Sequence, residues 1–511
     1  MGITQVPPVP TPTAKGEIVV GTATGPTRLP VSTTANQNLI TDPTTATGLK
    51  YGISGLAASH TSSIANLAST TYTITSMSYT NPNVTVTTST NHNFLVGHNV
   101  WITGCNNATQ SINTTSANIT AVTANTFTYN YGTTNPGALS AGGTVGLTYF
   151  GLHNGGKYLN GTFVLTTDQS SYLFSTDNGA TWNYGQVPTG QNSITDIDHD
   201  GTTWVFACAT AGLWRSTTLA SNSWTRCSTF GGFYANGVKW CGGSTNRWVA
   251  SGSSDSGSFG AGCRIETSSA GAVTWTSQTI GGINSYAGHT IGFDGNSTIV
   301  IFHGSTHAIT VGTGGGASWT GYTGPNTIAP SGAGVRSFAR TANSPFGYYN
   351  PVSGKWIQWN VGGGGMRYGM TTAGSPATFW TGEVSNTFPS SAGHNDVQNN
   401  GAYSNNLNNI WTIDTANSRL MTYSIAAGQF TVYSFSLTAT AVAAFNDTYP
   451  LIGIQTSTNL PNTEYPNTYS GNVQVQTNPL SAVYGNGRWV LATNTFTSSR
   501  LPSSVMITTL V

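Results

Sequence analysis

An internal repeat limits the fold of the last two-thirds of the chain more than any other feature. After residue 149, short apolar strands recur, each marked by one bulky residue: Phe163, Trp204, Trp248, Ile299, Trp356, Trp411 and Trp489. These positions are 41, 44, 51, 57, 55 and 78 residues apart. A period of about 40–50 residues with roughly four short strands in each repeat is typical of a β-propeller. The repeat therefore predicts a propeller over residues 149–511, with about seven blades.

A second aromatic residue closes most repeats, 19 to 27 residues after the first: Trp182, Trp224, Trp275, Trp319, Trp380 and Phe430. A single blade cannot bury both faces of its sheet, so we expect neighbouring blades to bury these rings. Nine tryptophans are the predicted blade anchors: Trp204, Trp224, Trp248, Trp275, Trp319, Trp356, Trp380, Trp411 and Trp489. The sequence also predicts long loops at Asn343–Pro351 and Asn459–Asn478, where ligand contacts can vary without disturbing the blades.

Composition supports an all-β chain and excludes several functions. Charged residues make up 6% of the sequence, Gly occurs 63 times, and the net charge is +1. Long helices need Ala, Glu, Lys and Leu, which are replaced here by Thr, Ser, Asn and Gly. Sixteen dispersed Lys and Arg residues make a poor nucleic-acid surface. No apolar window reaches the length of a membrane span, and no phosphate-loop motif occurs, so we expect neither a membrane span nor a cofactor.

One repeat contains a specific turn motif. Residues 175–182 read Ser-Thr-Asp-Asn-Gly-Ala-Thr-Trp. The motif begins at Ser175. In a hairpin turn, Asp177 would accept backbone N–H groups, Gly179 would supply a positive φ, and Trp182 would pack inside. The pattern resembles the Asp-box of sialidase-like propellers, where it is a structural staple. The resemblance implies a fold rather than a chemistry. Because the arginine-containing motif of sialidase catalysis is missing, we predict that the protein is not an enzyme.

The first 52 residues form a different region. A proline-rich stretch is followed by KGEIVVGT, RLPV and TGLKY. This segment resembles one near the N-terminus of tailed-bacteriophage tail-fibre and appendage proteins, with Tyr51 in place of the usual Trp. The resemblance implies an extended leader, residues 1–52, that attaches the protein to a virion. The matching attachment residues are Lys15, Gly16, Gly21, Arg28, Leu29 and Pro30. A linker is expected over 53–71.

Residues 72–148 are expected to form a small all-β module. Asn83–Thr88 alternates with a period of two, which indicates a half-buried strand. The run from Asn91 to Gly104 resembles a small barrel or sandwich that is inserted in many phage structural proteins. His92 and His98 are interpreted as polar turn positions rather than metal ligands, because no Asp, Glu or Cys stands near them.

Each of three further sequence patterns has a structural interpretation and a more specific alternative. Asp196, Asp198 and Asp200 imitate the start of a calcium loop, but the twelfth position is Ala207, so we expect turn chemistry. The aromatic run 356–359 could stack on sugars, although most of it is expected in the core. Five cysteines lack metal-type spacing and are expected to be buried free thiols, with a disulfide within 208–263 as the alternative: Cys105, Cys208, Cys227, Cys241 and Cys263.

These resemblances imply a bacteriophage virion structural protein, a tail fibre or appendage whose propeller binds a host-surface glycan or protein. A capsid decoration or head-fibre protein and a secreted Asp-box lectin or glycosidase are the alternatives; the lack of a readable signal peptide favours a virion location. The implied partners are other virion proteins, bound through the leader, and the host surface. Self-association is left open.

Overall fold

The computed structural model is almost entirely β-structure. It describes residues 18–22, 25–29, 38–41, 49–52, 70–105, 112–139, 142–148, 153–167, 169–190, 192–227, 234–253, 262–282, 288–303, 309–322, 346–350, 355–362, 365–372, 409–414, 419–424, 429–434, 443–445, 450–452, 479–486, 488–493 and 505–509. Two short 3-10 turns, η1 (Ala209–Ala211) and η2 (Ser221–Ser223), interrupt the strands. The described part of the chain has no helix that is long and apolar enough to span a membrane.

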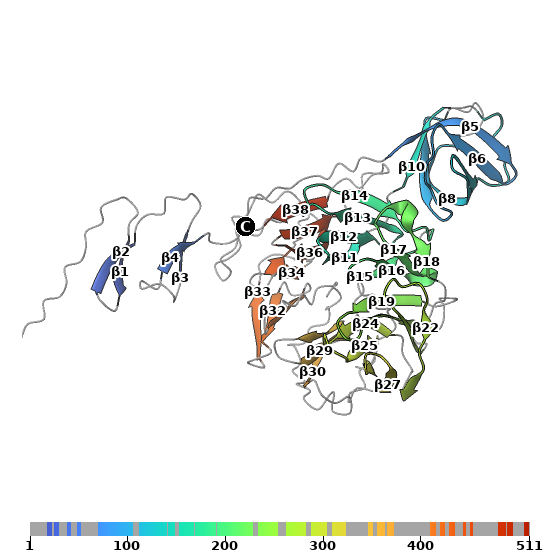
Figure 1. The fold of residues 1–511 in the computed structure, drawn as a ribbon. Helices are drawn as coiled ribbons and strands as arrows, with labels where there is room; N and C mark the ends of the chain where they lie inside the picture. Colours follow the sequence, from blue (N-terminus) through green and yellow to red (C-terminus); the bar gives the residue numbers. More distant parts are fainter. Residues whose placement is uncertain are drawn as a thin grey trace, which may run out of the picture. The chain divides into compact units, whose positions relative to one another are not determined.

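The small module is a closed antiparallel barrel (Figure 1). Its strand order is β10-β5-β6-β9-β8-β7. The alternation in Asn83–Thr88 turns Val84 and Val86 into the barrel core, where they meet Ile119 and Phe127. The strands are β5 (Tyr72–Thr80), β6 (Asn83–Thr88), β7 (Asn99–Thr103), β8 (Thr114–Val122), β9 (Thr126–Asn130) and β10 (Thr144–Leu147).

The chain after the barrel forms a β-propeller, as the repeat predicts. Among the described strands, seven antiparallel sheets of three or more strands follow one another along the sequence. Blades 1 to 3 have four strands each: β11 (His153–Leu159), β12 (Thr162–Thr167), β13 (Ser171–Ser175), β14 (Asn183–Gln186); β15 (Ile194–His199), β16 (Trp204–Cys208), β17 (Gly212–Ser216), β18 (Thr225–Arg226); β19 (Tyr234–Cys241), β20 (Arg247–Ser253), β21 (Cys263–Ser268), β22 (Thr276–Ser277).

The fourth sheet contains β24 (Gly288–Phe293), β25 (Ile299–His303), β26 (Ile309–Thr313) and β27 (Ser318–Tyr322), with β23 (Ile280–Gly282) added in parallel to β27. Three-stranded sheets and one two-stranded sheet follow: β28 (Phe346–Asn350), β29 (Lys355–Gly362), β30 (Gly365–Thr372); β31 (Asn409–Asp414), β32 (Arg419–Ser424), β33 (Gln429–Ser434); β34 (Ala443–Phe445), β35 (Pro450–Ile452); β36 (Pro479–Gly485), β37 (Arg488–Thr493), β38 (Val505–Thr509). Strand β28 occupies most of Asn343–Pro351, so the loop predicted there is wrong.

Neighbouring residues on a strand face different blades, and this buries both sides of each sheet. On β12, Phe163 and Leu165 pack with Val483 and Val490 of the last blade, whereas Val164 packs with residues of the second blade. The first strands of successive sheets contact one another from β11 to β28, and β36 contacts β11. The last blade therefore closes the ring against the first.

The tryptophan anchors occupy two recurrent places in the blades. Trp204, Trp248 and Trp356 lie on second strands, whereas Trp224, Trp275 and Trp319 lie at the start of fourth strands. All six are buried, with exposed fractions of 8% or less. Trp380 lies outside the described residues, as do the side chains of Trp411 and Trp489.

All five cysteines are buried thiols that form no disulfide, as the sequence predicts. Burial raises the pKa of Cys227 and Cys241 to about 12, so both thiols stay protonated at neutral pH. Cys227 and Cys241 belong to different blade-to-blade clusters of apolar side chains. They act as small hydrophobic residues in the packing of the propeller.

The turn prediction for the acidic cluster is wrong for two of its three members. Asp196 and Asp198 lie on strand β15, and their carboxylates accept N–H groups of strand β19 in the next blade, from Val238 at 3.0 Å and from Trp240 at 2.8 Å. Asp196 also pairs with the Lys157 ammonium of the preceding blade at 2.7 Å. Only a three-dimensional arrangement of blades brings these groups together, so local spacing could not reveal them.

Asp200 does lie in the turn, as predicted, and it also reaches the next blade. Its carboxylate accepts backbone N–H groups of Thr202 and Thr203 within the turn. The other oxygen accepts the Gly271 N–H at 3.0 Å and the Trp248 indole N–H at 3.1 Å. Burial alone raises the pKa of Asp200, but these donors outweigh it and hold the pKa below its ordinary value.

In the leader, strands β1 (Ile18–Thr22) and β2 (Gly25–Leu29) form a hairpin, and so do β3 (Asn38–Thr41) and β4 (Leu49–Gly52). The described residues of the leader are therefore paired into two hairpins rather than simply extended. Of the predicted attachment residues, Gly21 lies on β1, and Arg28 and Leu29 lie on β2. Lys15, Gly16 and Pro30 lie outside the described residues, as does the predicted linker except for its last two residues.

Candidate ligand-binding pocket beside the first blade

Residues 175–182, whose sequence resembles an Asp-box, form a hydrogen-bonded turn between β13 and β14. Ser175 Oγ donates to Asp177 Oδ1 and accepts the Gly179 N–H, both at 2.8 Å. Asp177 also accepts the Thr181 N–H at 2.8 Å, and hydrogen bonds from Thr181 lower the pKa of Asp177 to about 2. Gly179 has φ 84°, a conformation that favours glycine. This turn starts strand β14 and sets Trp182, which is 8% exposed, against Phe163.

Strand β14 then leads to a junction with the barrel that is built around the buried side chain of Gln186. Its Oε1 accepts the Asn99 N–H at 2.9 Å, and its Nε2 donates to the Asn99 carbonyl at 2.8 Å. Nε2 also donates to the Thr148 carbonyl. The amide thus pairs with both backbone groups of Asn99, as a neighbouring strand would. Gln186 is fully buried.

The turn before β7 supplies a second set of contacts between the barrel and the segment that follows β14. The Gly190 N–H donates to the Gly97 carbonyl at 2.9 Å, and Asn99 Nδ2 donates to the Gly190 carbonyl at 2.8 Å. Gly97 has φ 93°, and a Cβ there would collide with the backbone of Pro188. Glycine is therefore required by both the conformation and the close approach of the two backbones.

His92 and His98 occupy turn positions, as predicted, but both are buried. His92 Nδ1 accepts the Phe94 N–H, and His98 Nδ1 accepts the Leu95 N–H. His98 Nε2 then lies 3.1 Å from the Ser221 carbonyl of η2, to which it donates. Burial lowers the pKa of both rings, that of His98 to about 4. No cluster of three or more potential metal ligands occurs among the described residues.

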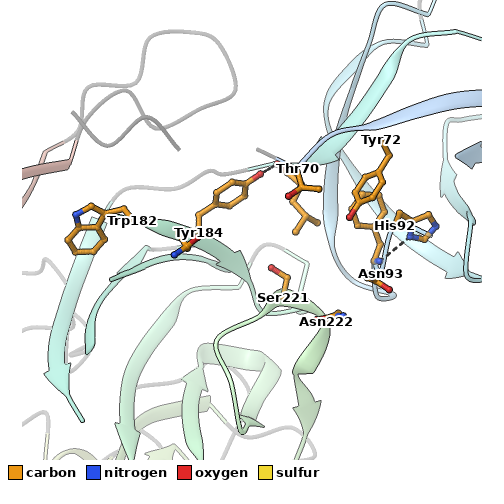
Figure 2. Close-up of a pocket in the computed structure, with 11 residues that line it drawn as sticks. Thr70, Tyr72, His92, Asn93, Trp182, Tyr184, Ser221 and Asn222 are labelled. Carbon is orange, nitrogen blue, oxygen red and sulfur yellow. Dashed lines mark hydrogen bonds between the residues drawn. The ribbon is translucent and has the colours of Figure 1, made fainter. Parts of the chain in front are cut away.

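A pocket of about 350 Å³ lies beside these contacts (Figure 2). The barrel contributes Tyr72, His92, Asn93, Phe94 and Leu147, and Thr70 lies two residues before its first strand. The first two blades contribute Trp182, Asn183, Tyr184, Ser221 and Asn222. The volume is at the lower end of the range of about 300–1,000 Å³ that is typical of small-molecule sites.

Intramolecular contacts fix several of the pocket walls. The Tyr184 hydroxyl donates to the Leu147 carbonyl at 3.2 Å, a bond drawn in Figure 2. Tyr72 packs edge-on against Phe94, with ring centroids 5.4 Å apart, and Phe94 stacks on His92 at 4.5 Å. The two tyrosine rings are half-buried, so each keeps part of its surface available to a ligand.

The chemistry of the pocket is aromatic and neutral. No Asp, Glu, Lys or Arg lines it, and most of its polar side chains carry amides or hydroxyls, with the His92 imidazole and the Trp182 indole beside them. No sequence motif indicates this site, because its lining runs from Thr70 to Asn222 and combines distant parts of the chain. Trp356, by contrast, lies in the core with 2% exposure, so it is not a sugar-stacking surface.

The class of protein that these features define is a β-propeller with an N-terminal β-barrel. No model of a known protein family and no curated protein matches the chain. Similar solved structures include the computationally designed protein Ika8, with 9% identity, 71% of this chain and 97% of that chain covered, and a TM-score of 0.43. YCF48 from Cyanidioschyzon merolae has 12% identity, coverage of 59% and 92%, and a TM-score of 0.38. The WD40 β-propeller domain of Doa1 has 10% identity, coverage of 70% and 94%, and a TM-score of 0.39.

Proposed function

We propose that this protein is a bacteriophage virion structural protein, of the tail-fibre or appendage type, that binds the host surface without catalysis. The observation that carries the binding role is the neutral pocket of aromatic, amide and hydroxyl groups beside the first blade. Such groups suit the hydroxyl-rich surface of a glycan. The virion location is proposed from the resemblance of residues 15–51 to the phage leader segment.

The described carboxylates support a role without turnover. Each carboxylate whose side chain the structure describes accepts hydrogen bonds from the protein itself: Asp177, Asp196, Asp198, Asp200, Glu266 and Asp294. Glu266, for example, is fully buried and pairs with Arg264 at 2.7 Å. Glycan hydrolysis needs two carboxyl groups that face the scissile bond, and these six are occupied in turns or between strands.

Binding is tested with the full-length protein, which is incubated with host cells, with extracted surface polysaccharide and with a glycan array. We expect saturable binding and no released oligosaccharide. Release of oligosaccharide that disappears when Asp or Glu residues are replaced would assign the protein to the glycosidases instead. Absence of binding to cells and to all glycans would contradict the host-binding role.

The virion location is tested separately, by deletion of residues 1–60 from the gene in a replicating phage. We expect particles that assemble without this protein, because the two leader hairpins are removed. Normal incorporation of the truncated chain would contradict attachment through the leader. Immunogold labelling of wild-type particles distinguishes a tail position from a capsid position.

A further inference from the structure

We propose that the pocket beside the first blade binds an uncharged saccharide, which contacts the barrel and the propeller at the same time. This inference rests on the proposed host-binding function and names the ligand class and the site. Its basis is the composition of the pocket and the presence of ligand-facing groups on both of its sides.

The charge of the pocket excludes anionic sugars. A carboxylate, sulfate or phosphate that leaves water needs a cation or several N–H donors as compensation. None of the lining residues is Lys or Arg. Its one ionisable imidazole, His92, is buried, and burial lowers its pKa, so the ring is neutral at pH 7. A neutral hexose or N-acetylhexosamine loses far less hydration on entering such a site.

The polar groups match sugar hydroxyls. Asn93, Asn183 and Asn222 are exposed, and their side-chain amides make no hydrogen bond within the described part of the chain. Each amide can donate and accept, which is the pattern that a hydroxyl also presents. Asn93 has φ 55°, a left-handed conformation that asparagine tolerates better than most residues.

The aromatic groups supply the apolar part of the recognition. Tyr72 comes from the barrel and Tyr184 from blade 1, and both rings are held by intramolecular contacts. Aromatic rings whose positions are already fixed by intramolecular contacts lose little conformational entropy when they stack on the C–H face of a sugar. A saccharide that reaches both rings links the barrel to the blade, so binding also stabilises the junction around Gln186.

The test uses the full-length protein on an array that carries neutral, sialylated, sulfated and uronate-containing glycans. Affinity for the best neutral glycan is then measured by quenching of tryptophan fluorescence, since Trp182 lines the pocket. The test variant is N183A/N222A, which removes two exposed amides. The matched control is N130A, an exposed asparagine at the end of β9 that does not line the pocket.

We expect neutral glycans to dominate the array. N183A/N222A should lower the affinity at least 10-fold with an unchanged melting temperature, whereas N130A should bind as the wild type does. Preferred binding of anionic glycans, or equal affinities of N183A/N222A and N130A, would overturn this inference and leave the host-binding function intact. Binding to cells that protease treatment abolishes, with no glycan bound, would also overturn it. Failure to bind either cells or glycans would overturn the proposed function itself.

Discussion

At the scale of single residues, the Gln186 side-chain amide makes the two hydrogen bonds that the backbone of a neighbouring strand would otherwise make. The amide pairs with the N–H and the carbonyl of Asn99, and the carbonyl also accepts the Thr148 N–H at 2.9 Å. A buried backbone group without a partner costs roughly 1–3 kcal/mol. The junction between barrel and blade therefore relies on Gln186 to bond the buried Asn99 N–H.

We expect Gln186→Ala to lower the free energy of unfolding by about 2 kcal/mol, because the buried Asn99 N–H loses its acceptor, whereas the Asn99 carbonyl keeps the Thr148 N–H. Gln169→Ala is the matched control. Gln169 is half-buried, and its Oε1 has no hydrogen-bond partner among the described residues, so we expect a change of about 0.5 kcal/mol or less. Urea unfolding, followed by tryptophan fluorescence, measures both; equal effects would contradict the assigned role.

His98 gives the junction a dependence on pH. Its pKa is lowered from 6.5 to about 4 by burial, so between these values the unfolded chain binds a proton that the folded chain does not. Stability therefore falls as the pH drops from 6.5 to 4, by about 3 kcal/mol in total at about 1.4 kcal/mol per pKa unit. His92, with a pKa that is also lowered, acts in the same direction.

We expect the urea midpoint of the wild type to fall between pH 6.5 and 4, and to fall less steeply in His98→Gln. Glutamine keeps a donor for the Ser221 carbonyl but has no proton to gain in this range. Parallel pH profiles for the two proteins would show that His98 does not control this transition.

At the scale of the elements, the first strands of the blades are linked by side chains that cross from one blade to the next. Lys157 of β11 pairs with Asp196 of β15, and Asp196 accepts an N–H of β19. Burial raises the pKa of Asp196, against the opposing effect of the Lys157 ammonium. The carboxylate thus joins three blades, which explains why an acidic residue is buried between them.

Replacement of this carboxylate should cost more than replacement of an acid in a local turn. We expect Asp196→Asn to lower the free energy of unfolding by about 2 kcal/mol, because it removes the charge from a buried carboxylate that pairs with the partly exposed Lys157 side chain. Asp294→Asn is the control, because Asp294 accepts N–H groups of residues 296–298 in its own turn and asparagine forms the same turn. Its expected cost is about 0.5 kcal/mol. Similar losses in both variants would contradict the inter-blade role.

At the scale of the whole molecule, the barrel and the propeller belong to one compact unit, Ser62–Ser457 with Gln476–Ile507. Hydrogen bonds of Gln186, Tyr184, Asn99 and His98 cross between the two parts. The sequence suggests two modules in series, but these bonds make the barrel a structural support of the first blade.

We expect a chain that begins at residue 149 to melt at a lower temperature than one that begins at residue 62. The shorter chain loses the partners of Gln186 and Tyr184 and exposes the backbone that packs against Gly97. Differential scanning calorimetry of the two chains measures the effect. Identical melting temperatures would mean that the barrel contributes nothing to the propeller.

The sequence by itself determined the features that depend on local periodicity. The repeat of bulky residues gave the propeller, the alternation in 83–88 gave a barrel strand, and the spacing of Ser175, Asp177 and Gly179 gave a turn. These signals are readable because burial of one face of a strand repeats every two residues, and burial of one blade repeats once per blade.

The tertiary structure alone decided which distant groups meet. Asn99 and Gln186 are 87 positions apart, and the Asp196 carboxylate meets an N–H 42 positions away. Closure of the ring by β36 against β11, and the pocket beside the first blade, also depend on such distant pairs. A polar side chain can form its hydrogen bonds with water, with the backbone of its own turn or with another blade. Its partner is set by the positions of the backbones, which periodicity does not specify.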